Sequence, residues 1–127
     1  MRLTLVAVLL LGSLAACRPA SHSVPQAIVG GMLIDGTVRP PIEHAVVLVS
    51  RGRVEAVGEE GQVRIPNGYN QIGVRGRFLF PPVLDQTIEP GQEANLLVLS
   101  VNPALDPDYL KKVTGRMESG RWVQYPQ

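Results

Sequence analysis

Residues 45–57 read AVVLVSRGRVEAV, and their pattern indicates the fold class. Residues 45–49 are five apolar, mostly β-branched positions, a length and composition typical of a buried strand. Residues 50–53 (SRGR) form a glycine-containing turn, and residues 54–57 return along the first strand. The stretch therefore predicts a β-hairpin with one fully buried strand.

Short apolar runs of the same kind occur on both sides of this hairpin. The further predicted strands cover residues 27–34, 71–74, 77–80, 95–99, 113–118 and 121–125. The one helix candidate is 106–112, where Asp106 would be the N-cap and Pro107 the first helical residue. About seven short strands separated by turn residues indicate an all-β sandwich or small barrel. In either form, residues 45–49 and 95–99 are expected to share one core.

Composition excludes several classes of protein. The chain has 127 residues, 45% of them hydrophobic and 18% charged, and a formal net charge of +1. A chain so close to neutral lacks the basic surface that nucleic-acid binding requires. Its single Cys permits no intrachain disulfide, and a (β/α)8 barrel would need roughly 250 residues. We expect one small domain that binds no nucleic acid.

Residues 1–16 have the pattern of a secretory signal peptide. Arg2 supplies a positive charge, residues 3–11 are apolar, and mostly small residues follow up to Ala16. The apolar run is shorter than the roughly 20 residues that span a bilayer. The segment Leu14-Ala15-Ala16-Cys17 resembles the bacterial lipobox. This resemblance implies cleavage between Ala16 and Cys17 and attachment of lipid, including palmitate, to Cys17.

The expected location is the bacterial cell envelope. Several acyl chains on Cys17 would anchor the protein durably, whereas one chain gives only marginal binding. Residues 17–26 would be a lipidated tether, and without residues 1–16 the chain has equal numbers of basic and acidic residues. Arg18 stands where lipoproteins of the inner membrane often carry Asp, which resembles outer-membrane sorting in a Gram-negative cell. The alternative is an ordinary signal peptide with an incidental Cys.

Residues 27–125 resemble the two ends of metal-dependent amidohydrolases. Residues 27–37 (AIVGGMLIDGT), the hairpin at 53–58 and residues 75–85 (RGRFLFPPVLD) are similar to the opening strands of that family. Residues 88–99 (IEPGQEANLLVL) are similar to its C-terminal return strand, and residues 102–123 to its closing hairpin. The resemblance implies that residues 27–125 form the small β-sandwich that flanks the catalytic barrel in the family.

The chain departs from the family pattern after Asp85. In the family such an Asp leads directly into a His-x-His pair of metal ligands, whereas here Gln86-Thr87-Ile88 follow. The segment that would supply the barrel and its ligands is absent, and Pro82 replaces a glycine of the family. The family uses zinc or another divalent metal, but we expect no metal, cofactor or catalytic residue in this chain.

The residues whose side chains could in principle bind a metal or act in catalysis are expected to have structural roles instead. A hydrolytic zinc takes about three protein ligands, and the chain has only His22 and His44, which we expect to be solvated. Asp85 is interpreted as a turn or capping residue. Ser50, His44 and Asp35 contain the residue types of a catalytic triad, but no nucleophile-elbow sequence supports that role. Trp122 and Tyr125 are expected in the core or covering a sheet edge.

Two functions follow from these observations. The first is a membrane-anchored, non-catalytic β-sandwich that acts as a structural or partner-binding module or is a truncated remnant. Its partners would be membrane lipid through Cys17 and a protein or a second copy of the chain. The alternative is part of a hydrolase of non-peptide C–N bonds whose barrel is supplied by another chain or is lost from this sequence.

Overall fold

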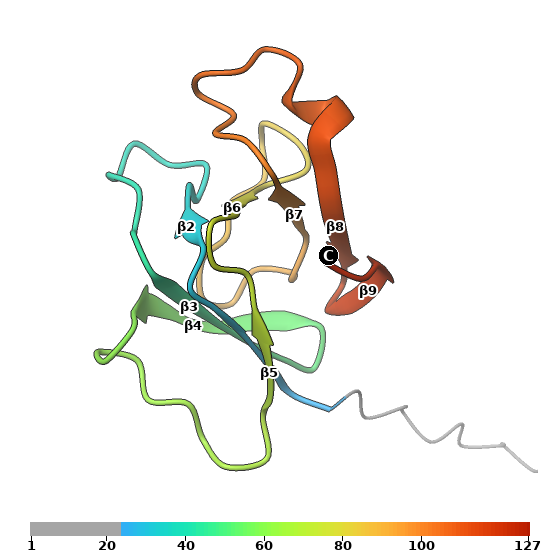
Figure 1. Cartoon of the computed structure of the whole chain (residues 1–127). Helices are drawn as coiled ribbons and strands as arrows, with labels where there is room; N and C mark the ends of the chain where they lie inside the picture. Colours follow the sequence, from blue (N-terminus) through green and yellow to red (C-terminus); the bar gives the residue numbers. More distant parts are fainter. Residues whose placement is uncertain (1–23) are drawn as a thin grey trace, which may run out of the picture.

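Two β-sheets make up the regular structure of residues 24–127, the part of the chain that the computed structural model describes (Figure 1). Sheet A has the strand order β4-β3-β1-β5, and sheet B has the order β2-β6-β7-β8-β9. The strands of sheet A are β1 (Gln26–Val29), β3 (Ala45–Ser50), β4 (Arg53–Glu59) and β5 (Asn70–Gly73). Those of sheet B are β2 (Met32–Leu33), β6 (Phe78–Phe80), β7 (Leu96–Leu99), β8 (Val113–Glu118) and β9 (Arg121–Gln124). The expected small all-β domain is confirmed.

The hairpin predicted at residues 45–57 is formed by β3 and β4. Its two-residue turn has positive φ at both central positions, 55° at Arg51 and 76° at Gly52. This conformation matches the right-handed twist of the paired strands, and glycine adopts it without strain. The pairing runs from Ser50 with Arg53 to Ala45 with Glu59. Because β3 lies between β4 and β1, it is a central strand.

Both faces of β3 are covered, which explains its unbroken apolar sequence. Successive side chains of a strand point to opposite faces of the sheet. Val47 and Val49 belong to the main core between the sheets, together with Leu96 and Val98 of β7. The core shared by residues 45–49 and 95–99 is thereby confirmed.

The opposite face of β3 carries a second, smaller core under the loop of residues 60–69. Val46 and Leu48 are buried there together with Ala27 of β1. The loop covers them with three partly buried side chains, Val63, Ile65 and Tyr69. The Tyr69 hydroxyl also donates a hydrogen bond to the Glu55 carboxylate on β4.

The single strand predicted at residues 27–34 is wrong. The chain leaves sheet A after β1 and enters sheet B as β2, with Gly30 and Gly31 between the two strands. Gly30 has φ of 98°, and a Cβ there would lie 2.6 Å from the Arg75 side chain. The segment that contains β5 and β6 also crosses from sheet A to sheet B. It runs beside the first segment, because β5 pairs in parallel with β1 and β6 pairs in parallel with β2.

The helix predicted at residues 106–112 is also wrong. The structure has only a 3-10 turn, η1 (Tyr109–Lys112), preceded by Asp108 without a side-chain cap. The Asp106 carboxylate instead accepts hydrogen bonds from the Asp108 backbone N–H at 2.8 Å and from Lys112 Nζ at 2.6 Å. A short Asp side chain that bonds the backbone two residues ahead stabilises a turn in place of a helix.

The closing hairpin of β8 and β9 ties sheet B to the first strand of sheet A. Gln26 Nε2 donates to the Gly120 carbonyl at 2.9 Å, and Trp122 Nε1 donates to Gln26 Oε1 at 2.5 Å. A Cβ on Gly120 would lie 2.8 Å from Gly52 Cα, so the turns of the two hairpins meet. Trp122 also packs against the main core, as expected.

Candidate functional site

The lipidation and cleavage residues predicted from the sequence, Cys17 and Ala16, lie outside the described residues. His22, assigned to the tether, lies outside them as well. Within residues 24–127 no helix is long and apolar enough to cross a membrane. Of the residues with chemistry-bearing side chains that the sequence pointed to, Asp35, His44, Ser50 and Asp85 lie in the described part of the chain.

Asp35 organises the turn that follows β2. Its Oδ1 accepts hydrogen bonds from the Thr37 backbone N–H at 2.9 Å and from Thr37 Oγ1 at 2.6 Å. Its Oδ2 lies 3.4 Å from Arg39 Nε, and Asp35 is only 8% exposed. The Asp35-Gly36 sequence, a turn signal, therefore produces a carboxylate held by its own loop.

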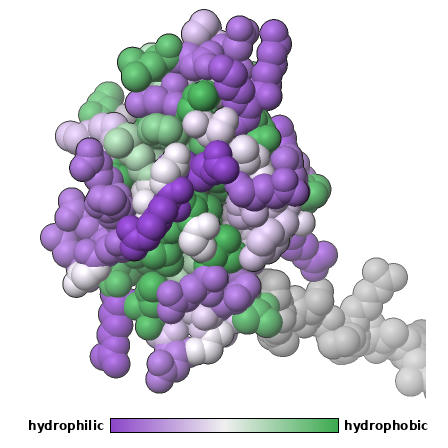
Figure 2. All heavy atoms as spheres, viewed as in Figure 1, coloured by the Kyte–Doolittle hydropathy of each residue, from purple (hydrophilic) through white to green (hydrophobic). Residues whose placement is uncertain are grey.

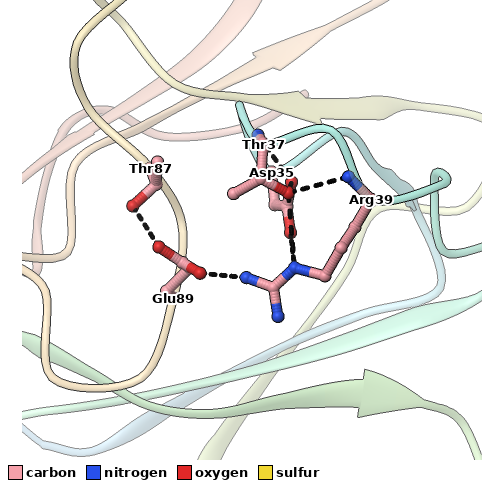
Figure 3. Close-up of polar contacts among 5 residues, drawn as sticks. All are labelled: Asp35, Thr37, Arg39, Thr87 and Glu89. Atoms are coloured by element: carbon pink, nitrogen blue, oxygen red, sulfur yellow. Dashed lines mark hydrogen bonds and ion pairs between the residues drawn. The ribbon is translucent and has the colours of Figure 1, made fainter.

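Arg39 connects this turn to a segment far away in the sequence. Its guanidinium also donates to Glu89 Oε1, and the other oxygen of Glu89 accepts a bond from Thr87 Oγ1 at 2.7 Å (Figure 3). We call Asp35, Thr37, Arg39, Thr87 and Glu89 the polar clasp. It joins the loop after β2 to the segment that follows Asp85.

A backbone hydrogen bond joins the same two segments, the loop after β2 and the segment after Asp85. The Ile88 N–H donates to the Asp35 carbonyl at 3.0 Å, and Ile88 is buried at 1% exposure. A Cβ on Gly36 would lie 2.8 Å from the Gln86 carbonyl oxygen and 2.9 Å from Pro81 Cγ. Glycine at position 36 therefore allows the two segments to touch.

A shallow hollow of about 320 Å³ lies beside the clasp. Ile42, Val57 and Ile88 provide apolar lining, and Arg39 and Glu89 provide charged lining. Because these two charges pair with each other, neither is free to act alone on a ligand.

Asp85 is exposed at the junction, the link between Asp85 and Gln86 where the two family-like segments meet. It borders a hollow of about 210 Å³ together with Gln86, Thr87 and Glu93. Among residues 24–127 no His lines this hollow. Gln86 Oε1 is buried without a hydrogen-bond partner among the described residues.

In the described part of the chain no hydrogen bond joins Ser50, His44 and Asp35, the three residue types of a catalytic triad. Exposed His44 immediately precedes β3 and Ser50 ends it, and a strand rises about 3.3 Å per residue. Asp35 is bonded to Thr37 and Arg39. His44 instead lines an open hollow of about 280 Å³ with Glu43, Glu59 and Glu60. Within residues 24–127, no group of three or more His, Cys, Asp or Glu side chains could hold a metal ion.

Sequence reasoning missed a polar cluster around the closing hairpin. Ser119 Oγ donates to Glu93 Oε1 at 2.8 Å, and the Ser119 N–H donates to Asn95 Oδ1 at 2.7 Å. The bond from Ser119, helped by one from Asn95, lowers the pKa of Glu93 below its ordinary value. The partners are more than twenty residues apart, so local sequence offered no signal for the pairing.

Comparison with known proteins finds similarity only among solved structures. No family model matches the chain, and no curated protein does. Molinate hydrolase shares 33% identity over 47% of this chain and 13% of its own, with a TM-score of 0.42. The guanine deaminase of E. coli shares 26% identity over 46% of this chain and 17% of its own, with a TM-score of 0.39.

A putative prolidase from Bifidobacterium longum is similar to a comparable extent. It shares 21% identity over 47% of this chain and 15% of its own, with a TM-score of 0.44. The three structures are amidohydrolase-family enzymes, and this chain spans less than a fifth of the length of each. At TM-scores below 0.5 the similarity does not by itself assign a fold or an activity to this chain.

Proposed function

We propose that the protein is a lipoprotein of the bacterial envelope whose β domain is a non-catalytic structural or partner-binding module. One observation carries this proposal: the domain closes on itself at Asp85-Gln86. The chain returns to Asp35 within three residues of the junction, through the bond from the Ile88 N–H to the Asp35 carbonyl at 3.0 Å. The ion pair of Arg39 and Glu89 joins the same two segments. A domain closed here completes its core without an inserted barrel.

The environment of the acidic side chains supports a non-catalytic role. Asp35 is engaged by Thr37 and Arg39, so its carboxylate stabilises a turn. In the part of the chain that the structure describes, Asp85 has no His beside it in its hollow. Metal-dependent hydrolysis needs about three protein ligands and an open coordination position.

Several apolar side chains on loops are exposed. Leu84 is 91% exposed and Leu105 is 82% exposed, and Val38 is fully exposed. On the face drawn in Figure 2, apolar residues lie in separate groups among polar ones. Apolar side chains exposed singly are ordinary on protein surfaces, so the partner-binding role rests on the closed, non-catalytic domain and not on an apolar patch.

The anchoring part of the proposal rests on the lipobox-like residues before Arg18. Residues 18–25 connect Cys17 to β1, which begins at Gln26. An extended residue spans at most about 3.3–3.6 Å, so this tether would hold the domain within roughly 30 Å of the bilayer.

Metabolic labelling with radioactive palmitate tests the anchor. The wild-type chain should be labelled and recovered with membranes, and Cys17→Ser should abolish both. Ser13→Ala, a change in the same segment that spares Cys17, is the matched control and should keep the label. In a Gram-negative host, Arg18→Asp should move the protein from the outer to the inner membrane. Recovery of the wild type as an unlipidated periplasmic protein would contradict the anchor.

Metal analysis and amide-hydrolysis assays test the non-catalytic role. The purified protein should bind no stoichiometric zinc and should leave hydantoins and dihydropyrimidines intact. Tight binding of one metal ion per chain, lost in His44→Ala, would contradict the proposal. Hydrolysis that appears only when a second chain copurifies would favour the alternative, a hydrolase with a separately encoded barrel.

A further inference from the structure

The loop of residues 60–69 ends in a tight turn at Pro66-Asn67-Gly68-Tyr69. The Tyr69 N–H donates to the Pro66 carbonyl at 3.4 Å, and Gly68 has φ of 90°. Positive φ at the third residue is the mark of a type II turn, which favours glycine there. The turn places the Tyr69 ring on the second core, above Val46 and Leu48.

Asn67 and Gly68 are both exposed at the tip of this turn. Within the part of the chain that the structure describes, no hydrogen bond engages the Asn67 side chain or the Gly68 N–H. A Cβ at Gly68 would meet no atom within 4 Å, so no other segment packs against this side of the turn. The side-chain amide of Asn67 and the next backbone nitrogen therefore face water together.

We propose that Asn67 is a site of spontaneous deamidation. The Gly68 nitrogen loses its proton to solvent base and attacks Cγ of Asn67, forming a C–N bond that closes a five-membered succinimide ring. The bond from Cγ to the side-chain nitrogen breaks, and that nitrogen leaves as ammonia. Water then opens the ring at either carbonyl, which leaves aspartate or isoaspartate at position 67. No step requires an oxidant or an enzyme.

The other three asparagines lack this combination of features. Asn102 is followed by Pro103, which has no backbone N–H to act as the nucleophile. Asn95 is held through both side-chain atoms, Nδ2 by Glu93 at 3.3 Å and Oδ1 by the Ser119 N–H at 2.7 Å.

Asn70 is restrained by the sheet. It lies in β5, paired with Gln26 of β1, and the residue after it carries a side chain. A strand held in a ladder cannot readily turn its backbone nitrogen onto the preceding side chain.

Asp35-Gly36 is the other pair in which glycine follows an Asn or Asp, and the structure protects it. The Asp35 carboxylate is 8% exposed and accepts two bonds from Thr37. An ionised carboxylate is also a much poorer electrophile than an amide. The structure therefore singles out Asn67.

Deamidation would alter the cover of the second core. It adds a negative charge at the turn, and isoaspartate lengthens the main chain by one carbon. Either change acts on the turn that holds Tyr69 over Val46 and Leu48.

The test is peptide mapping of the full-length protein aged in mildly alkaline buffer. Trypsin cleavage after Arg64 and Arg75 releases the peptide 65–75, and fragment ions within it separate Asn67 from Asn70. We expect the mass gain of amide-to-acid conversion at Asn67, faster at higher pH, together with labelling by an isoaspartyl methyltransferase. Asn67→Ser should lose both signals. An unchanged Asn67, or one that changes no faster than Asn70, would overturn the proposal.

A second variant tests the nucleophile. Gly68→Ala places a methyl group beside the attacking nitrogen and should slow the reaction severalfold. A rate equal to that of the wild type would show that the Gly68 nitrogen does not attack, and the proposal would fail.

Discussion

Replacing Gln26 by Met should destabilise the domain by about 2–4 kcal/mol. The side chain is 9% exposed and makes two long-range bonds, to the Gly120 carbonyl at 2.9 Å and from Trp122 Nε1 at 2.5 Å. Met has nearly the same size and can make neither bond. An unpaired buried polar group costs about 1–3 kcal/mol, and Gly120 is buried whereas Trp122 is only partly so. Net stabilities of small domains are about 5–15 kcal/mol, so this loss is large.

The assay is urea unfolding of the purified protein followed by circular dichroism. Gln71→Met is the matched control, because Gln71 lies on β5 beside Ala27 and is exposed. The control should change the free energy of unfolding by less than about 0.5 kcal/mol. A double-mutant cycle with Trp122→Phe should show coupling between positions 26 and 122. Equal stabilities of the Gln26 variant and the control would refute the reasoning.

Two further predictions concern the charged groups. Arg39→Ala removes the ion pairs with Asp35 and Glu89, and the Arg39 side chain is 59% exposed. The free energy of unfolding should therefore fall by no more than about 1 kcal/mol for each pair. A much larger loss in urea unfolding would show that the polar clasp dominates stability. The folded-state pKa of Glu93 is lowered from its ordinary value of 4.5. Ionised Glu93 therefore stabilises the folded state above that pH, and this stabilisation is lost as the pH falls below it. Ser119→Ala should weaken this acid dependence of the melting temperature, with Ser100→Ala as the control, and an unchanged dependence would contradict the role of Ser119.

Local patterns in the sequence were sufficient for most of the strands and for the two hairpins. The apolar run at 45–49 followed by Arg51-Gly52 specifies a buried strand and its turn, because β-branching and glycine act over a few residues. The same holds for the closing hairpin around Ser119-Gly120. The common core of β3 and β7 could be predicted because both runs are too apolar to remain exposed.

The remaining features depend on contacts that local patterns do not encode. Two glycines within an apolar run are compatible with a β-bulge in one strand and equally with a change from one sheet to another. The change of sheet at Gly30-Gly31 depends on pairing with β5 and β6, which lie far away in the sequence. At 106–112, the signals for a helix N-terminus and for a turn use the same Asp residue. The bond of Gln26 to Trp122 and the polar clasp join distant segments, so neither could be predicted.

The segments before and after Asp85 should fold only together, as one self-contained domain, and cutting the chain at this point tests whether they do. The fragment 18–85 lacks β7, β8 and β9, and with them Leu96, Val98 and Met117 of the main core. Truncating one core side chain to Ala costs about 2–5 kcal/mol, so losing all of them exceeds the margin of a small domain. Circular dichroism and limited proteolysis should show fragment 18–85 unfolded, with structure restored on adding peptide 86–127. A protease-resistant fragment 18–85 that melts cooperatively would contradict the claim.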